Sequence, residues 1–119
     1  GGGDTDPGQC DAGPDVTLLV DDVPVTGLSA GQGQYLDFAV DVPAGLSRVR
    51  FDTWKGSGDA DLYVAHERQP TTEDYDYAPF LVGNTERVIV RRPATGRWYI
   101  RVNAYEAFNG LKVRVRFYD

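Results

Sequence analysis

Apolar and polar residues alternate with a period of two over most of the chain after residue 15. In residues 35–42 the even positions are Leu, Phe, Val and Val, whereas the odd positions are Tyr, Asp, Ala and Asp. The same alternation recurs in residues 98–104 and 111–117, with Tyr, Arg, Asn or Lys between the apolar residues. Successive side chains of a β-strand point to opposite faces of its sheet, so each segment is predicted to be a strand with one buried face.

Shorter alternations predict four further strands, which cover residues 16–20, 48–53, 60–64 and 88–90. Turn-forming residues separate the strands, and residues 67–85 form a long irregular stretch. No stretch of even about ten residues shows the 3.6-residue period of a helix. About seven or eight short strands, with a turn every 8–14 residues or so, predict an all-β fold, an antiparallel β-sandwich or jelly roll.

The first residues differ in composition from the rest. Residues 1–14 are rich in Gly, Asp and Pro and contain no large apolar residue, which predicts a flexible linker before a folded domain of residues 15–119. The chain begins Gly-Gly-Gly-Asp and contains no Met, so we expect it to be a processed or excised piece of a longer protein. No apolar run approaches the length of about 18 residues that a membrane-spanning helix needs, and no membrane span is predicted.

Charge is unevenly distributed along the chain, whose net charge is −6. Residues 1–42 contain eight Asp and no Lys or Arg, whereas residues 43–119 contain all 12 basic residues and 10 acidic ones. A nucleic-acid-binding domain is usually basic, so this balance argues against nucleic acid as a partner. The alternation places Arg97, Arg101, Arg114 and Arg116 outward, which predicts a guanidinium-rich surface on one sheet. That surface is either an ordinary solvated face or a patch that docks an acidic partner.

The sequence contains little that could catalyse a reaction. Its only histidine is His66, its only cysteine is Cys10 in the linker, and no serine lies in a Gly-x-Ser-x-Gly motif. Nucleophilic catalysis needs a nucleophile, a base and a group that orients the base, and a zinc site needs three or four nitrogen or sulfur ligands. We therefore predict no catalytic residue and no zinc site.

Carboxylates are the one group from which a metal site could be built. Asp59 and Asp61 project to the same face at the start of a strand, and Asp76 lies in the irregular stretch that follows. Calcium accepts clustered carboxylate and carbonyl oxygens from loops, so these three are the candidate ligands of a Ca²⁺ ion. The alternative is that they cap turns by accepting hydrogen bonds from backbone N–H groups, in which case no cofactor is required.

Aromatic residues gather in two segments that are predicted to be irregular. The candidate ligand-binding residues are Tyr75, Tyr77 and Phe80 in the first and Tyr105 and Phe108 in the second. Rings on loops of a rigid sandwich can bind sugars or extended polypeptides. They can equally form a lid that closes one end of the sandwich, and both interpretations remain open.

Several short motifs occur in an order and at spacings that resemble one protein family. They are Gly-Asp-Ala-Asp-Leu-Tyr-Val (58–64), Gln-Pro-Thr-Thr (69–72), Tyr-Asp-Tyr-Ala-Pro-Phe (75–80), Gly-Asn-Thr-Glu (83–86), Pro-Ala-Thr-Gly-Arg-Trp-Tyr-Ile (93–100) and Ala-Tyr (104–105), with Val-Thr-Gly-Leu-Ser-Ala (25–30) and Asp-Val-Pro-Ala-Gly (41–45) upstream. Over residues 16–118 the chain resembles the bacterial pre-peptidase C-terminal domain.

The resemblance implies a β-sandwich that follows the catalytic domain of secreted metallopeptidases and serine peptidases. In such proteins the domain is often removed during maturation, and in some members it assists binding to insoluble substrates such as collagen. The resemblance thus implies an extracellular, non-catalytic accessory domain that assists substrate binding, secretion or maturation. Its expected partner is a protein substrate or the parent catalytic domain. A carbohydrate-binding module with a polysaccharide partner, and a structural or interaction domain, are the alternatives.

The chain departs from the family at two places. Many members have a disulfide between positions that are Tyr77 and Val88 here, so the loop should be held by packing or hydrogen bonds instead. Related calcium-binding modules of collagenases have acidic residues where this chain has Gly-Gln-Gly-Gln (31–34), which leaves only a calcium site built around Asp59, Asp61 or Asp76.

Overall fold

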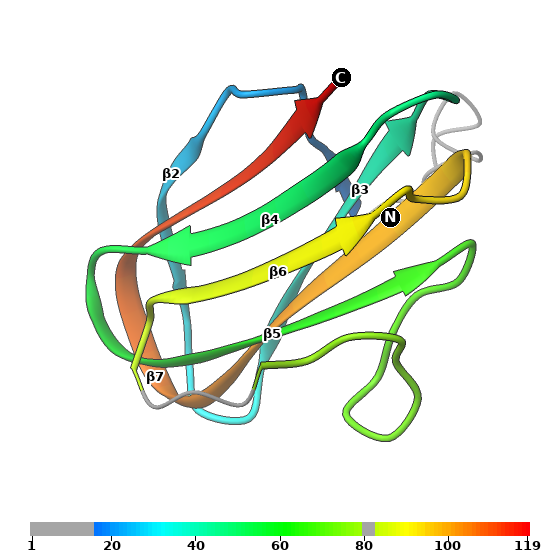
Figure 1. Cartoon of the computed structure of the whole chain (residues 1–119). Helices are drawn as coiled ribbons and strands as arrows, with labels where there is room; N and C mark the ends of the chain where they lie inside the picture. The colour runs from blue at the N-terminus through cyan, green and yellow to red at the C-terminus, as the bar shows by residue number, and fades with distance from the viewer. Residues whose placement is uncertain (1–15, 80–82) are drawn as a thin grey trace, which may run out of the picture.

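The computed structural model describes residues 16–79 and 83–119. The described residues form seven strands and no helix: β1 Val16–Leu18, β2 Val25–Ala30, β3 Tyr35–Val42, β4 Arg48–Trp54, β5 Ser57–His66, β6 Glu86–Arg91 and β7 Gly96–Tyr118 (Figure 1). The all-β prediction is confirmed. Consistent with this, the part of the chain that the structure describes offers no helix long and apolar enough to cross a membrane.

The strands form two layers that share β7. The first half of β7 pairs with β3 on one side and β5 on the other, and β1 extends this layer by pairing in parallel with β3. We call this layer sheet I. The second half of β7 pairs with β2 and with β4, and β4 pairs in turn with β6; this layer is sheet II. In Figure 1, β7 changes from orange to red as it bends around one end of the fold from the first layer into the second.

The core lies between the two sheets. The inward positions expected from the alternation are buried, among them Phe38 and Ile100 in sheet I and Val49 and Val115 in sheet II. The rings of Phe51 in β4 and Trp98 in β7 meet across the layers with their centroids 6.2 Å apart. The two apolar faces therefore cover each other, which is the packing of a β-sandwich.

Two elements differ from the sequence-based prediction. Residues 98–104 and 111–117 belong to one strand of 23 residues rather than to two strands joined by a turn, because residues between them keep strand partners: Glu106 pairs with Asp59 and Phe108 with Ala30. Strand β2 was not predicted as a strand. Its glycine, Gly27, has a φ of +69° and its pairing with β7 shifts register twice, which interrupts the simple alternation.

Side chains close one end of β5, the edge strand of sheet I. The backbone N–H of Ala60 donates to Oδ1 of Asn84 at 3.0 Å, and that of Leu62 donates to Oε1 of Glu86 at 2.6 Å. Asn84 and Glu86 belong to the Gly-Asn-Thr-Glu motif at the start of β6, an edge strand of sheet II, and both are buried. Two side-chain oxygens thus replace a neighbouring strand and join the open edges of the two sheets.

The irregular segment after β5 closes the other end of the same edge. The N–H of Val64 donates to the carbonyl oxygen of Tyr77 at 2.9 Å, and the N–H of His66 donates to Oδ2 of Asp76 at 2.8 Å. Every second N–H of β5 from Ala60 to His66 consequently has a partner, so the edge cannot pair with another strand through these groups. These hydrogen bonds also hold the loop at Tyr77, as was predicted for a chain without the disulfide.

Candidate functional site

Two exposed tyrosines lie on the outer face of sheet I. Tyr35 of β3 is paired with Asn103 of β7, which is paired on its other side with Asp61 of β5, so these three side chains form one row across the sheet. Tyr105 follows Asn103 by two residues, at the point where the pairing of β7 with β5 shifts register. Alternation from Asn103 places it on the same face, diagonally across from Tyr35. The tyrosines are 50% and 65% exposed. We call these four residues the tyrosine surface.

An arginine holds one of these rings in place. The guanidinium carbon of Arg101 lies 3.6 Å from the centroid of the Tyr35 ring. Arg101 itself donates two hydrogen bonds to Asp37, at 2.8 and 3.1 Å, and these raise the pKa of its guanidinium above the usual value. The stack fixes one face of the Tyr35 ring and leaves the rest of it to solvent, so little side-chain freedom remains to be lost when a ligand binds.

The predicted aromatic residues have different environments. Tyr105 is exposed, as a ligand-binding residue must be, and Tyr77 is 38% exposed beside β6. Tyr75 packs its ring 5.4 Å from that of Tyr63 and covers the outer face of sheet I. Phe108 is 3% exposed in the core, so its candidacy as a ligand-binding residue was wrong: it lies on the inward side of a continuous strand, not in a turn. Phe80 lies outside the described residues.

The predicted carboxylates are occupied by separate partners. Asp59 accepts a hydrogen bond from the N–H of Gly83 at 3.1 Å. Asp76 pairs with Arg68 at 3.0 Å, and this contact, together with the hydrogen bond from the N–H of His66, lowers the pKa of Asp76. Within residues 16–79 and 83–119 no three His, Cys, Asp or Glu side chains come together as metal ligands would. Asp59 and Asp76 each accept a hydrogen bond from the backbone N–H of another segment, Asp59 from Gly83 and Asp76 from His66 in β5.

Asp61 is the exception among these acids. Burial, reinforced by the charge of Asp59, raises its pKa above 3.8, while a hydrogen bond with Glu86 acts in the opposite direction. A carboxyl whose pKa is raised by folding binds its proton more tightly in the folded state. Ionisation of Asp61 therefore lowers the free energy of unfolding once the pH rises above the ordinary pKa of a carboxyl group. Below that pH the group is protonated in both states and the destabilisation is absent.

We expect Asp61→Asn to raise the melting temperature slightly at pH 7, and the difference from wild type to vanish near about pH 3, where the carboxyl is protonated in both states. Thermal unfolding at both pH values measures this. The same melts with millimolar calcium should shift little. A rise of many degrees with calcium that Asp61→Asn abolishes would instead identify a cation site at this carboxylate.

The side chain of His66 is held by contacts with a turn and with a core residue. Its Nε2 lies 3.1 Å from the carbonyl oxygen of Thr95, and its ring packs 4.8 Å from that of Trp98. The imidazole is thus held against the neighbouring turn and the edge of the core.

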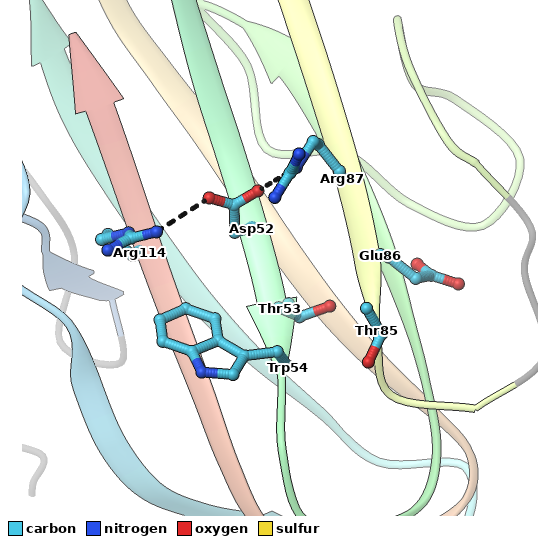
Figure 2. A pocket seen from close by; sticks show the side chains of 7 residues that line it. All are labelled: Asp52, Thr53, Trp54, Thr85, Glu86, Arg87 and Arg114. Atoms are coloured by element: carbon cyan, nitrogen blue, oxygen red, sulfur yellow. Dashed lines mark hydrogen bonds and ion pairs between the residues drawn. The ribbon is translucent and has the colours of Figure 1, made fainter.

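A second polar feature lies on the outer face of sheet II, where a hollow of about 570 Å³ opens beside Trp54 (Figure 2). Asp52 of β4 lies in it and is only 4% exposed. Arg87 from β6 and Arg114 from β7 reach this carboxylate from either side, at 2.9 and 3.5 Å. The guanidinium of Arg114 also lies 5.0 Å from the Trp54 ring. The sequence pattern did not predict this charged site.

The four arginines predicted to share one sheet are divided between two. Arg97 and Arg101 lie on sheet I, where Asp41 and Asp37 neutralise them. Arg114 and Arg116 lie on sheet II, because β7 crosses between the layers before it reaches them. The prediction of one shared surface was wrong for the first pair.

Comparison with known proteins agrees with this architecture. The family model of the bacterial pre-peptidase C-terminal domain matches residues 34–104. Alkaline serine exoprotease A of Vibrio alginolyticus is 37% identical over 96% of this chain, and an extracellular protease of Xanthomonas campestris pv. campestris is 37% identical over 83% of it. The chain covers 22% and 17% of the lengths of these relatives. The solution structure of vEP C-ter 100 superposes with a TM-score of 0.70 at 27% identity and covers 84% of this chain and 98% of that one. The chain belongs to the bacterial pre-peptidase C-terminal domain family.

Proposed function

We propose that this domain is a non-catalytic accessory module of a secreted peptidase, and that its tyrosine surface binds the enzyme's insoluble protein substrate outside the cell. The observation that carries the proposal is the pair of exposed rings, Tyr35 and Tyr105, on paired strands of sheet I. Tyrosines on rigid strands offer a large apolar contact with a hydroxyl at its end, and they lose little conformational freedom on binding.

The neighbours of the rings suit an extended polypeptide. Asn103 and Asp61 lie in the same row as Tyr35, so amide and carboxylate groups flank the aromatic contact. Such groups can bond to the peptide N–H and C=O groups of a bound chain. The relatives that match this chain are named as proteases, which makes a protein the natural ligand to test first.

The test is co-sedimentation of the 119-residue chain with insoluble collagen and elastin, and in parallel with cellulose and chitin. We expect binding to a fibrous protein, and we expect Tyr35→Ala and Tyr105→Ala each to weaken it about tenfold, as the loss of a central aromatic contact does. Ile89→Ala, which removes an exposed apolar side chain from the opposite sheet, is the matched control and should leave binding unchanged.

Two results would contradict the proposal. Binding to a polysaccharide but to neither fibrous protein, abolished by the same tyrosine variants, would identify a carbohydrate-binding module. Binding to none of the four solids would leave a structural or interaction domain as the better assignment.

A further inference from the structure

The outer face of sheet II is strongly basic although the chain as a whole has a net charge of −6. Outward positions on its three adjacent strands β6, β4 and β7 carry seven cations. We call them the basic face: Arg48, Arg50, Arg87, Arg91, Lys112, Arg114 and Arg116. Among residues 16–79 and 83–119, two carboxylates pair with them, Asp52 within the sheet and Asp22 at its side. The face thus has a large excess of positive charge.

Like charges lie directly opposite each other on this face. Arg48 of β4 is paired with Arg91 of β6, and Arg50 of β4 is paired with Arg116 of β7. Like charges at directly opposed positions of neighbouring strands destabilise a sheet. A solvated face requires only polar residues at these positions. Two pairs of opposed arginines therefore indicate a function of this face that outweighs their destabilising effect on the sheet.

Three of these cations surround one ring. The guanidinium carbons of Arg48, Arg50 and Arg116 lie 4.0, 5.7 and 5.4 Å from the centroid of Tyr118. Arg50 also pairs with Asp52, and Arg116 has a carboxylate of Asp22 at 3.7 Å. Among the residues that the structure describes, no carboxylate pairs with Arg48. An anion placed over Tyr118 would therefore be within reach of a cation that is not yet neutralised.

The neighbouring Asp52 demonstrates how this face holds a carboxylate. Its two oxygens accept from Arg50 at 2.8 Å and Arg87 at 2.9 Å, with Arg114 at 3.5 Å. Guanidinium groups suit carboxylates because their planar N–H donors can make paired hydrogen bonds. Arg48 and Arg91, which lie in the same cross-strand row as Tyr118, carry the same donors, and among the described residues no carboxylate pairs with either of them.

The spacing of the cations defines the shape of the ligand. Side chains two residues apart on one face of a strand repeat at about 6.6 Å. Arg48 and Arg50 therefore follow each other at this distance along β4, and Arg114 and Arg116 do so along β7. Acidic residues at alternate positions of an extended peptide repeat at the same distance. Asp22 and Asp52 interrupt the positive field, which disfavours uniformly charged polyanions such as nucleic acid or sulfated polysaccharide.

We propose that the basic face docks an extended acidic segment of another polypeptide, with carboxylates at alternate residues seated around Tyr118. This surface is on the sheet opposite the tyrosine surface, so it goes beyond the proposed function and its test is independent of substrate binding.

The experiment measures binding of the 119-residue chain to a fluorescein-labelled peptide of alternating Glu and Ser, at low salt and again at high salt. We expect binding that salt weakens, and no binding of the matching peptide of alternating Gln and Ser. The double variant Arg48→Gln/Arg116→Gln should bind about tenfold more weakly. The control Arg68→Gln/Arg97→Gln removes the same charge away from the face and should bind as wild type does.

A melting curve of the double variant separates loss of the site from loss of the fold. Removal of opposed like charges should leave its melting temperature equal to or above that of wild type. The proposal is overturned if the Glu peptide does not bind at low salt, if both double variants weaken binding equally, or if heparin or single-stranded DNA binds more tightly than the peptide.

Discussion

Replacement of Gly56 by alanine is expected to prevent stable folding. Gly56 lies in the corner between β4 and β5 with a φ of +78°, and a Cβ atom there would overlap the carbonyl oxygen of Asn109 in β7. The obstacle is backbone, which cannot rotate away as a side chain can. The corner and β7 would have to separate where the chain passes between the two sheets, and we expect a cost of about 4 kcal/mol or more.

The matched control is Gly33→Ala. Gly33 has nearly the same φ, +80°, but open space around the position of a Cβ atom. Alanine there incurs only the strain of a left-handed conformation, about 1–2 kcal/mol. Urea unfolding of both variants compares the two costs, and equal destabilisation would mean that the close approach between Gly56 and β7 is not a feature of the protein in solution.

Loss of the Asn84 side chain is expected to cost about 3 kcal/mol of the free energy of unfolding, since three backbone groups lose a buried partner. Asn84 is 8% exposed and accepts from the N–H of Ala60. Its amide nitrogen donates to the carbonyl oxygens of Lys55 and Ser57, each at 3.0 Å. One side chain therefore fixes the β4–β5 corner and the edge of β5 together.

Chemical denaturation of Asn84→Ala measures this cost, and Asn84→Asp tests its cause. Aspartate keeps an acceptor for Ala60 but places oxygen, not N–H, against two carbonyl groups, so it should not rescue stability. Asn109→Ala, at an exposed position of β7, should change stability by less than about 0.5 kcal/mol. If Asn84→Ala were as mild as this control, the motif would need another explanation than closure of the sandwich edge.

The prediction for Asn84 gives the Gly-Asn-Thr-Glu motif a structural meaning. The Asn and Glu side chains bond to the edge of β5 in place of a strand, and the loop at Asp76 and Tyr77 completes that closure. The outward faces of the two sheets take no part in this closure. One carries exposed tyrosines, and the other carries arginines whose charges are only partly neutralised.

The sequence by itself determined most of the strands and the inward face of each, with β2 and the middle of β7 as the exceptions. In β3, β4 and the first half of β7 the alternation correctly placed Phe38, Phe51 and Ile100 in the core, because strand geometry permits only two directions for a side chain. It also identified Tyr105 as a candidate ligand-binding residue. Tyr35 was placed outward but not recognised as a partner of Tyr105, since its neighbours across the sheet are distant in sequence.

Only the tertiary structure decided which outward residues are neighbours. Local alternation fixes the face of a side chain but not the sheet to which its strand belongs, because strand pairing depends on contacts far apart in the chain. The continuity of β7 placed Phe108 in the core and separated Arg97 from Arg116. Pairing of β4 with both β6 and β7 then gathered the basic face from three segments. The fold could thus be predicted from local periodicity, whereas the candidate surfaces arise from pairing between distant strands.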